Sequence, residues 1–241
     1  MNLSWLEDFL ALALTKNFSR AADLRHMTQP TLQFAATHTL SFTFMPNWLR
    51  GLESRVSVGA VQCVSDMLQR CENLMLQGKV QFVLSHTHPH VKGQLEAAGF
   101  PSIQLGTDTL IPVSLADDQG QPRHPAINSR SCPIQLLNYS AESGIGRILW
   151  AVLGPELDRL SIQTIFTAHL ASVLKPMVLS GRGIAWLPQS LIADDLDSGR
   201  LLRIGPEDWE IPLQVRLYRG RSNIGRTAEM FWHAVSSCDR N

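Results

Sequence analysis

The sequence has no surplus of either charge, because its 21 Lys and Arg residues are matched by 21 Asp and Glu residues. No global field therefore draws the chain onto nucleic acid or an acidic surface, so any contact with nucleic acid must be local. No apolar stretch is long enough to cross a membrane, and the N-terminus lacks the basic, apolar and small-residue order of a signal peptide. These absences predict a cytoplasmic protein with no membrane partner.

Cysteine is scarce, and its spacing forms no pairs. Cys63, Cys71, Cys132 and Cys238 are scattered along the chain, which favours reduced thiols over a disulfide framework or a zinc site. Glycine-rich phosphate loops and a GxSxG elbow are absent. The carboxylates of ADDLD, residues 193–197, are typical of a solvated helix face. We therefore predict no enzyme activity, no metal site and no cofactor.

What is present indicates a globular protein. The chain has 241 residues, of which 44% are hydrophobic and 17% charged, enough to bury the core of one large or two small domains. Apolar runs alternate with amphipathic stretches, which predicts an α/β fold with mainly parallel strands and ligand sites beyond their carboxyl ends. After a first strand from Leu32, the predicted strands are 56–58, 80–84, 110–115, 134–137, 162–166, 183–187 and 213–218. The predicted helices are 44–52, 64–77, 146–153, 169–179, 189–197 and 227–235.

The first 33 residues predict a small helical unit. An amphipathic helix over residues 3–15 is followed by the run FSRAADLRHMTQPTL, residues 18–32, with its capping hydroxyls, its Ala-Ala pair and Pro30 in the first turn of another helix. This run resembles the N-terminal helix-turn-helix of LysR-type transcriptional regulators. The resemblance implies contacts with DNA from Ser19, Arg20, Thr28, Gln29, Pro30 and Thr31.

The family pattern stops after Gln33. The rest of the recognition helix, the basic wing and the long linker helix are missing, and the chain passes directly into LQFAATHTL, residues 32–40. A recognition helix over residues 28–33 is only about 9 Å long and cannot nucleate by itself. Without the wing it also lacks phosphate contacts. We therefore infer an internal deletion, which argues against autonomous DNA binding.

The rest of the chain resembles a complete effector domain of that family, which implies a two-lobed, periplasmic-binding-protein-like fold. We place the truncated helix-turn-helix at 1–33, the first part of lobe I at 34–131, lobe II at 132–208 and the return to lobe I at 209–241. LNYS at 137–140, GIAWLP at 183–188 and AEMFW at 228–232 are most similar to the hypochlorite-responsive members. Gly181 and Gly183 are interpreted as scaffold residues at tight turns.

The junction between the first strand and its helix is the main candidate site. Hydroxyls and a histidine at the start of a helix favour an anion, since the backbone N–H groups there are free and the helix dipole is positive. The alternative is that Thr37 or Thr39 only caps the helix. Polar groups at other strand ends, together with one large apolar wall, extend the predicted ligand pocket. The predicted ligand-binding residues are Thr37, His38, Thr39, Ser85, His86, Asn138, Tyr139, Ser140, Thr167, His169 and Trp186.

Two further patterns have competing interpretations. His86, His88 and His90 alternate in SHTHPH and offer imidazoles to one metal, but Pro89 and the lack of nearby cysteine or carboxylate favour a solvated loop. Several methionines stand at apolar helical positions, which favours a role in filling the core. The resemblance to an oxidant sensor makes methionine or cysteine oxidation a competing hypothesis.

These inferences predict a LysR-type regulator that senses a small ligand or oxidant between two lobes and pairs as a homodimer or higher homo-oligomer. Its established relatives convert effector-domain rearrangement into a new arrangement of DNA-binding heads. The competing hypothesis is a stand-alone ligand-binding or dimerising module that touches no DNA. The missing wing and linker helix favour that alternative.

Overall fold

The computed structural model describes residues 9–10, 12–14, 31–53, 58–125, 133–222 and 224–238. The strands are β1 Leu32–Thr37, β2 Val61–Asp66, β3 Phe82–Thr87, β4 Ser102–Leu115, β5 Ile134–Tyr139, β6 Ile162–Ala168, β7 Ala185–Pro188, β8 Leu201–Arg203 and β9 Ile211–Arg219. The helices are α3 His38–Thr43, α4 Met45–Glu53, α5 Leu68–Leu76, α6 Gln94–Ala97, α7 Gly144–Leu157, α8 Ala171–Leu179, α9 Gln189–Asp197, the short η1 Glu207–Trp209, and α10 Arg226–Cys238.

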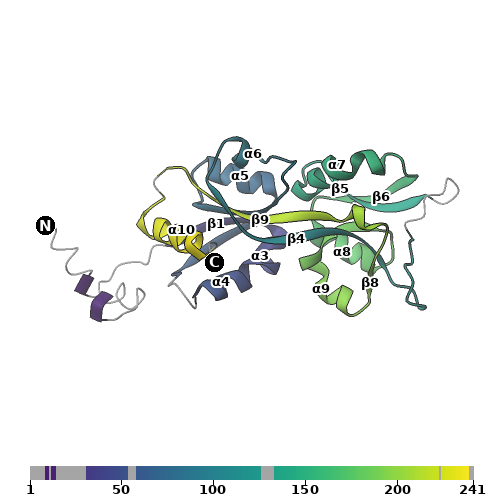
Figure 1. Cartoon of the computed structure of the whole chain (residues 1–241), viewed down its shortest axis with the longest axis horizontal. Coiled ribbons are helices and arrows are strands. Elements are labelled where there is room, and N and C mark those ends of the chain that lie inside the picture. Colours follow the sequence, from purple (N-terminus) through teal and green to yellow (C-terminus); the bar gives the residue numbers. More distant parts are fainter. Residues whose placement is uncertain are drawn as a thin grey trace.

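The molecule is elongated and has two lobes (Figure 1). Lobe I contains β1 to β3 with α3 to α6 and α10, and lobe II contains β5 to β8 with α7 to α9. The long strands β4 and β9 run through both and pair with each other antiparallel. A 7-stranded sheet follows the order β2-β1-β3-β9-β4-β7, with β8 also on β4. The two-lobed α/β prediction is thus confirmed, while the exact residue limits of the lobes stay a prediction.

The sheet of lobe I is buried on both faces, and successive side chains of its strands point alternately to the two faces. Phe34 of β1 and Phe82 of β3 lie on the face covered by α3, α4 and α10, where their ring centroids are 5.0 Å apart. Phe231 of α10 packs edge-on against Phe34. Ala35 and Val83 point to the other face and meet α5 and α6. Side chains at alternate strand positions therefore supply two cores in one lobe.

The prediction of mainly parallel strands is wrong. β1 pairs parallel with β2 and β3, and β5 pairs parallel with β6, but β9 is antiparallel to β3 and β4, and β4 is antiparallel to β7 and β8. The reason is the return of the chain: a single strand that comes back from lobe II must run against the strand that left lobe I. Sequence periodicity does not encode strand direction.

The apolar pattern also misses the strand β2. Of the strand predicted over 56–58, residues 56 and 57 lie outside the described residues and Val58 belongs to no strand. The prediction of a helix over 64–77 is wrong at its start, because β2 covers 61–66 and α5 begins only at Leu68. β2 is the edge strand of the sheet, and most of its side chains are exposed. A half-solvated strand does not need the apolar alternation that identifies buried strands.

The acidic run of α9 is not uniformly solvated, as the sequence had suggested. Asp194 and Asp197 are exposed, but Asp195 is fully buried. Its carboxylate lies 2.7 Å from Nζ of Lys175 and 2.6 Å from Nη2 of Arg200. Asp195 therefore joins α9 to α8 and to the start of β8, because a buried carboxylate requires cationic partners.

The predicted helix-turn-helix lies almost entirely outside the described residues. Residues 9–10 and 12–14 are helical, within the helix predicted over 3–15. Of the predicted DNA-binding residues, the structure describes only Thr31, which is exposed immediately before β1. None of the described helices is both long and apolar enough to cross a membrane.

Candidate functional site

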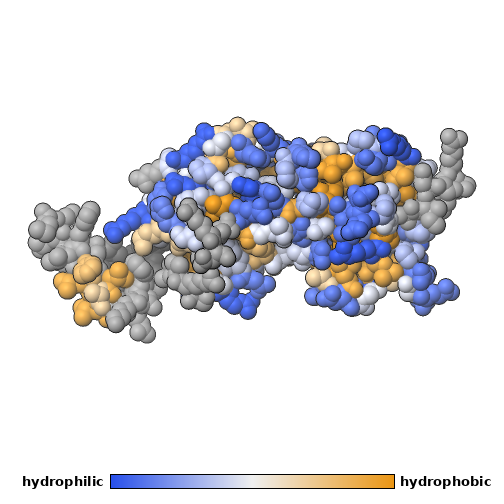
Figure 2. All heavy atoms as spheres, in the orientation of Figure 1, coloured by the Kyte–Doolittle hydropathy of each residue, from blue (hydrophilic) through white to orange (hydrophobic). Residues whose placement is uncertain are grey.

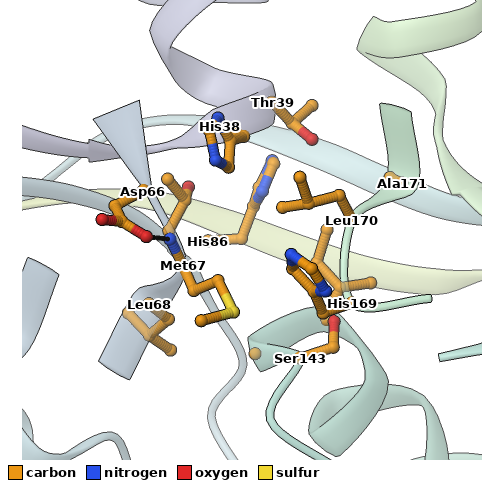
Figure 3. Close-up of a pocket in the computed structure, with 13 residues that line it drawn as sticks. His38, Thr39, Asp66, Met67, Leu68, His86, Ser143, His169, Leu170 and Ala171 are labelled. Carbon is orange, nitrogen blue, oxygen red and sulfur yellow. Dashed lines mark hydrogen bonds between the residues drawn. The ribbon is translucent and has the colours of Figure 1, made fainter. Parts of the chain in front are cut away.

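A pocket lies between the lobes, beside the strands that join them, with a volume of about 440 Å³ that includes space open to solvent. Lobe I contributes the ends of β1, β2 and β3 with the starts of α3 and α5, and lobe II contributes the starts of α7 and α8 (Figure 3). We call it the cleft pocket. It is lined by Thr37, His38, Thr39, Asp66, Met67, Leu68, His86, Ser143, Gly144, Ile145, His169, Leu170 and Ala171.

Four helices begin at the cleft pocket. The residues just before α3, α5, α7 and α8 are Thr37, Met67, Ser143 and Leu170, and all four line it. Only Ser143 accepts a capping hydrogen bond on its side chain, from the backbone N–H of Gly146. Helix starts carry backbone N–H donors and partial positive charge. Their position around one space favours a negatively charged group there.

The hydroxyl of Thr37 is buried and has no hydrogen-bond partner among the described residues. Thr37 is the residue before α3, yet its side chain makes no capping hydrogen bond. Thr39 lies inside the helix, and it is its carbonyl that accepts a hydrogen bond, from Thr43. The alternative that these threonines only cap the helix is therefore wrong. A buried hydroxyl without a partner costs free energy unless something in the pocket satisfies it.

His38 is oriented by a short chain of hydroxyls. Its Nδ1 lies 2.9 Å from Oγ of Ser65, which lies 2.8 Å from Oγ of Ser41. Ser41 in turn donates to the carbonyl oxygen of His38 at 2.7 Å. This closed set of contacts joins α3 to the edge strand β2 and holds the imidazole in place. Figure 3 shows His38, His86 and His169 around the same space, from three different elements.

His86 is the most deeply buried imidazole of the three, with 4% of the residue exposed. Its Nε2 lies 3.0 Å from Oδ2 of Asp108 on β4, and its Nδ1 has no partner among the described residues. Asp108 also accepts hydrogen bonds from the hydroxyl of Ser190 at 2.6 Å and from its backbone N–H at 3.1 Å. Burial raises the pKa of Asp108, but the hydrogen bonds from His86 and Ser190 outweigh it and lower the pKa.

The structure gathers part of the predicted ligand set around one pocket. Thr37, His38, Thr39, His86 and His169 line the cleft pocket. Ser85 lines a second one, the flanking pocket, on the other side of the contact between α5 and α7. Whether these residues bind a ligand stays a prediction.

The remaining predicted residues lie outside both pockets. Tyr139 and Trp186 belong to the core of lobe II: the Tyr139 hydroxyl donates to the Trp186 carbonyl at 2.8 Å, and the Trp186 indole donates to the Trp209 carbonyl at 2.9 Å. Asn138 accepts from Trp150, Ser140 is half-buried after β5, and Thr167 is exposed on β6. Successive residues of a strand face opposite sides, and the side of β5 that holds Tyr139 faces the lobe II core.

Sequence reasoning missed several lining residues. The prediction missed Asp66, Met67 and Leu68 because it assigned residues 64–77 to a helix. Ser143 and Gly144 open α7, and the run SGIG after a strand signals a serine cap. Asp108 lines neither pocket but contacts His86, and it was also missed, because it lies in the polar first part of β4, which the apolar pattern did not identify as a strand.

The alternating histidines do not form a solvated loop. His86 lies in β3 and is 4% exposed, and His88 is 7% exposed, so only His90 of the three is exposed. The rings of His88 and His90 are perpendicular, with centroids 5.2 Å apart. Burial, and then the charge of His90, lower the pKa of His88. Among the described residues no group of three or more histidines, cysteines or carboxylates could hold a metal.

Comparison with known families identifies the domain to which this fold belongs. The LysR substrate binding domain matches residues 25–237. The chain belongs to the LysR family of transcriptional regulators. The family prediction is confirmed, and the matched region is the effector-binding domain of these regulators.

Two relatives from Escherichia coli are similar over most of this LysR-family chain. The HTH-type transcriptional regulator YjiE of strain K12 is 29% identical over 220 residues, which cover 90% of this chain and 69% of YjiE. The HTH domain-truncated transcriptional regulator QseD of strain O157:H7 is also 29% identical over 220 residues, covering 90% of this chain and 86% of QseD. A shortened DNA-binding head therefore has a precedent among similar proteins.

Solved structures agree on the fold. The apo regulatory domain of HypT from Salmonella typhimurium has a TM-score of 0.72 and 26% identity, covering 87% of this chain and 95% of that domain. Full-length HypT, described as a hypochlorite-specific LysR-type regulator, has a TM-score of 0.73 and 23% identity, covering 99% of this chain and 98% of HypT. At that lower identity the likeness concerns the fold alone.

Proposed function

We propose that the cleft pocket binds a small anionic effector. The observation that carries this proposal is the convergence of four helix N-termini and three imidazoles on a pocket that contains one carboxylate, Asp66. One oxygen of that carboxylate already accepts the backbone N–H of Met67 at 2.7 Å. Backbone N–H groups and imidazoles are donors suited to anions. A HypT regulatory domain with a bound bromide ion, 26% identical to this chain, supports the same class of ligand.

Ligand binding at this pocket can change the relative position of the two lobes. His38 and His86 belong to lobe I, whereas Ser143 and His169 belong to lobe II, so one ligand contacts both lobes. A ligand that binds better when the lobes are close shifts the population toward that state. We infer that effector binding in this regulator sets the relative position of the lobes.

We expect a change in the relative position of the lobes to alter how this chain associates with other copies of itself. Large apolar side chains are exposed on the edge strand β2 and on lobe II, where Figure 2 shows hydrophobic residues at the surface. Val64 is 37% exposed, Ile165 is 38% exposed and Val173 is 39% exposed. Exposed apolar surface beside an open strand edge favours pairing with another subunit. We propose that this regulator works as a homo-oligomer in the cytoplasm.

The second candidate function is an effector-binding module that regulates by pairing with related subunits without touching DNA. The shortened helical segment before β1 and the similarity to QseD, named as a truncated regulator, favour it. Fluorescence anisotropy with DNA flanking the gene, over a salt series, separates the two. Sequence-selective binding supports a DNA-binding regulator, and a folded oligomer that does not bind supports the module.

The anion proposal is tested with sodium bromide, using sodium gluconate at equal ionic strength as the control. Tryptophan fluorescence and histidine NMR resonances follow the titration. We expect saturable changes with bromide, weakened several-fold by His169→Ala and unaffected by Thr167→Val, since Thr167 is exposed outside the pocket. A response that is linear in salt for both anions would contradict the proposal.

A further inference from the structure

His86 and Asp108 form a buried pair behind the cleft pocket. Their side chains are only 3% and 4% exposed, and Nε2 of His86 lies 3.0 Å from Oδ2 of Asp108. The pKa of Asp108 is lowered by hydrogen bonds despite its burial, so its carboxylate is ionised at neutral pH. An ionised carboxylate can only accept hydrogen bonds. Nε2 of His86 therefore carries a proton, in either charge state of the ring.

This arrangement fixes the chemistry of the other ring nitrogen. In a neutral imidazole with its proton on Nε2, Nδ1 is a bare lone pair. Nδ1 has no partner among the described residues, and the side chain lines the cleft pocket. A lone pair repels an anion, whereas an imidazolium offers Nδ1–H as a charge-assisted donor. An anion beside His86 is therefore bound by the protonated ring.

We propose that Asp108 is a positioning residue that makes anion binding in the cleft pocket take up one proton at Nδ1 of His86. This rests on the proposed function of the pocket. The proton comes from solvent: neutral His86, one proton and one anion become an imidazolium paired with the anion on one side and with Asp108 on the other. No other bond forms or breaks.

The other ionisable groups around the cleft pocket differ from His86 in their contacts. Nδ1 of His38 lies 2.9 Å from Oγ of Ser65, and His169 is exposed to solvent. The remaining ionisable groups that line the two pockets are Asp66, Glu72, Lys92, Arg147 and Tyr218. Burial, partly offset by hydrogen bonds from backbone N–H groups and by Arg147, raises the pKa of Glu72. Burial raises the pKa of Tyr218 to about 12. None of these groups touches Asp108 in the way His86 does.

The pair also joins the two lobes. Asp108 lies on β4, accepts hydrogen bonds from His86 of lobe I, and accepts two more from Ser190 at the start of α9 in lobe II. The Ser190 hydroxyl additionally lies 3.4 Å from Oγ1 of Thr43 in α3. A change in the charge of His86 therefore acts directly on Asp108, the residue that holds α9 against lobe I.

The experiment measures bromide affinity of the whole chain as a function of pH, with histidine ring resonances observed by NMR. Binding coupled to one proton weakens about tenfold for each pH unit above the pKa of the free ring. We expect that slope, together with an upward shift of the titration midpoint of His86 on adding bromide. His86→Gln assigns the resonance, and should abolish the pH dependence of binding.

Two variants separate positioning from structure. Asp108→Asn keeps the shape but removes the charge, and we expect weaker bromide binding with proton uptake displaced to lower pH. Ser190→Ala is the matched control, because it removes a donor to the same carboxylate and leaves the His86 contact, so proton uptake should persist. Bromide binding with no pH dependence in the native chain, or uptake assigned to His38 or His169, overturns this inference and leaves the anion site standing. No saturable bromide binding at any pH overturns the proposed function itself.

Discussion

Gly144, the first residue of α7, lies so close to Leu68, the first residue of α5, that a Cβ atom on Gly144 would fall 2.8 Å from Cδ2 and 3.0 Å from Cβ of Leu68. This contact joins the two lobes and separates the cleft pocket from the flanking pocket. A leucine Cβ cannot rotate out of the way, so a larger residue at 144 must separate the helices.

Gly144→Ala is therefore expected to weaken bromide binding at least several-fold and to open the lobes slightly. Fluorescence titration measures the first effect and small-angle X-ray scattering the second. Gly154→Ala, in the same helix, is the control, because its added Cβ would meet only Trp150 at 3.8 Å. The control should bind normally and gain about 0.5–1 kcal/mol of helix stability. Equal affinities for the two variants would show that the contact does not set the pocket.

Thr37→Val is expected to raise stability and lower affinity together. The Thr37 hydroxyl is buried without a partner among the described residues, so replacing it with a methyl group removes a desolvation cost of about 1 kcal/mol. The same change removes a donor from the cleft pocket. Urea unfolding and bromide titration test both effects. A loss of stability would mean that the hydroxyl has an internal partner.

Asp195→Ala is expected to destabilise the protein by roughly 3 kcal/mol, because it leaves Lys175 without the carboxylate that anchors it between α8 and α9. The side chain of Arg200 is 61% exposed, so water replaces the lost carboxylate and the loss of this ion pair costs less free energy than that of Lys175. Asp194→Ala, at the exposed neighbouring position, should change the free energy of unfolding by less than about 0.5 kcal/mol. Circular dichroism during urea unfolding compares the two. Similar values would indicate that Asp195 is as solvated as its neighbour.

Alkaline pH is expected to destabilise the protein through Cys71. Burial, followed by the charge of Asp66, raises the pKa of this thiol to about 12 from an ordinary value of 9.0. Below pH 9.0 the thiol keeps its proton in both states, so this group has no effect on stability. As pH rises from 9.0 towards 12, the unfolded chain loses the proton while the folded chain keeps it, and stability falls.

Unfolding free energies measured across that pH range should decline, and Cys71→Ala should remove the part due to the thiol. A thiol reagent provides a second readout in a Cys132→Ser and Cys238→Ser background. Cys63 is exposed and Cys71 is buried, so the native protein should label once and the unfolded protein twice. Labelling of Cys71 at the rate of Cys63 would contradict its burial.

The sequence alone determined the family, the alternation of helices and strands, and the strand-to-helix junction at Thr37 and His38. These features depend on local patterns: apolar periodicity, helix caps and a short run of residues shared with relatives. α9 was predicted at its observed bounds, and Gly181 has the positive φ of 70° that its position in a tight turn suggested.

Only the tertiary structure decided which polar residues meet. His86 and Asp108 are 22 residues apart, and their pairing depends on β9 lying between β3 and β4 in the sheet. The burial of Asp195 depends likewise on a lysine in another helix. The side chains of Tyr139 and Trp186 lie in the core of lobe II, because the direction and register of a strand determine which face of the sheet each side chain occupies. Apolar periodicity predicts that successive side chains of a strand alternate between the two faces of the sheet. Which residues become neighbours across the sheet depends on how the whole chain packs.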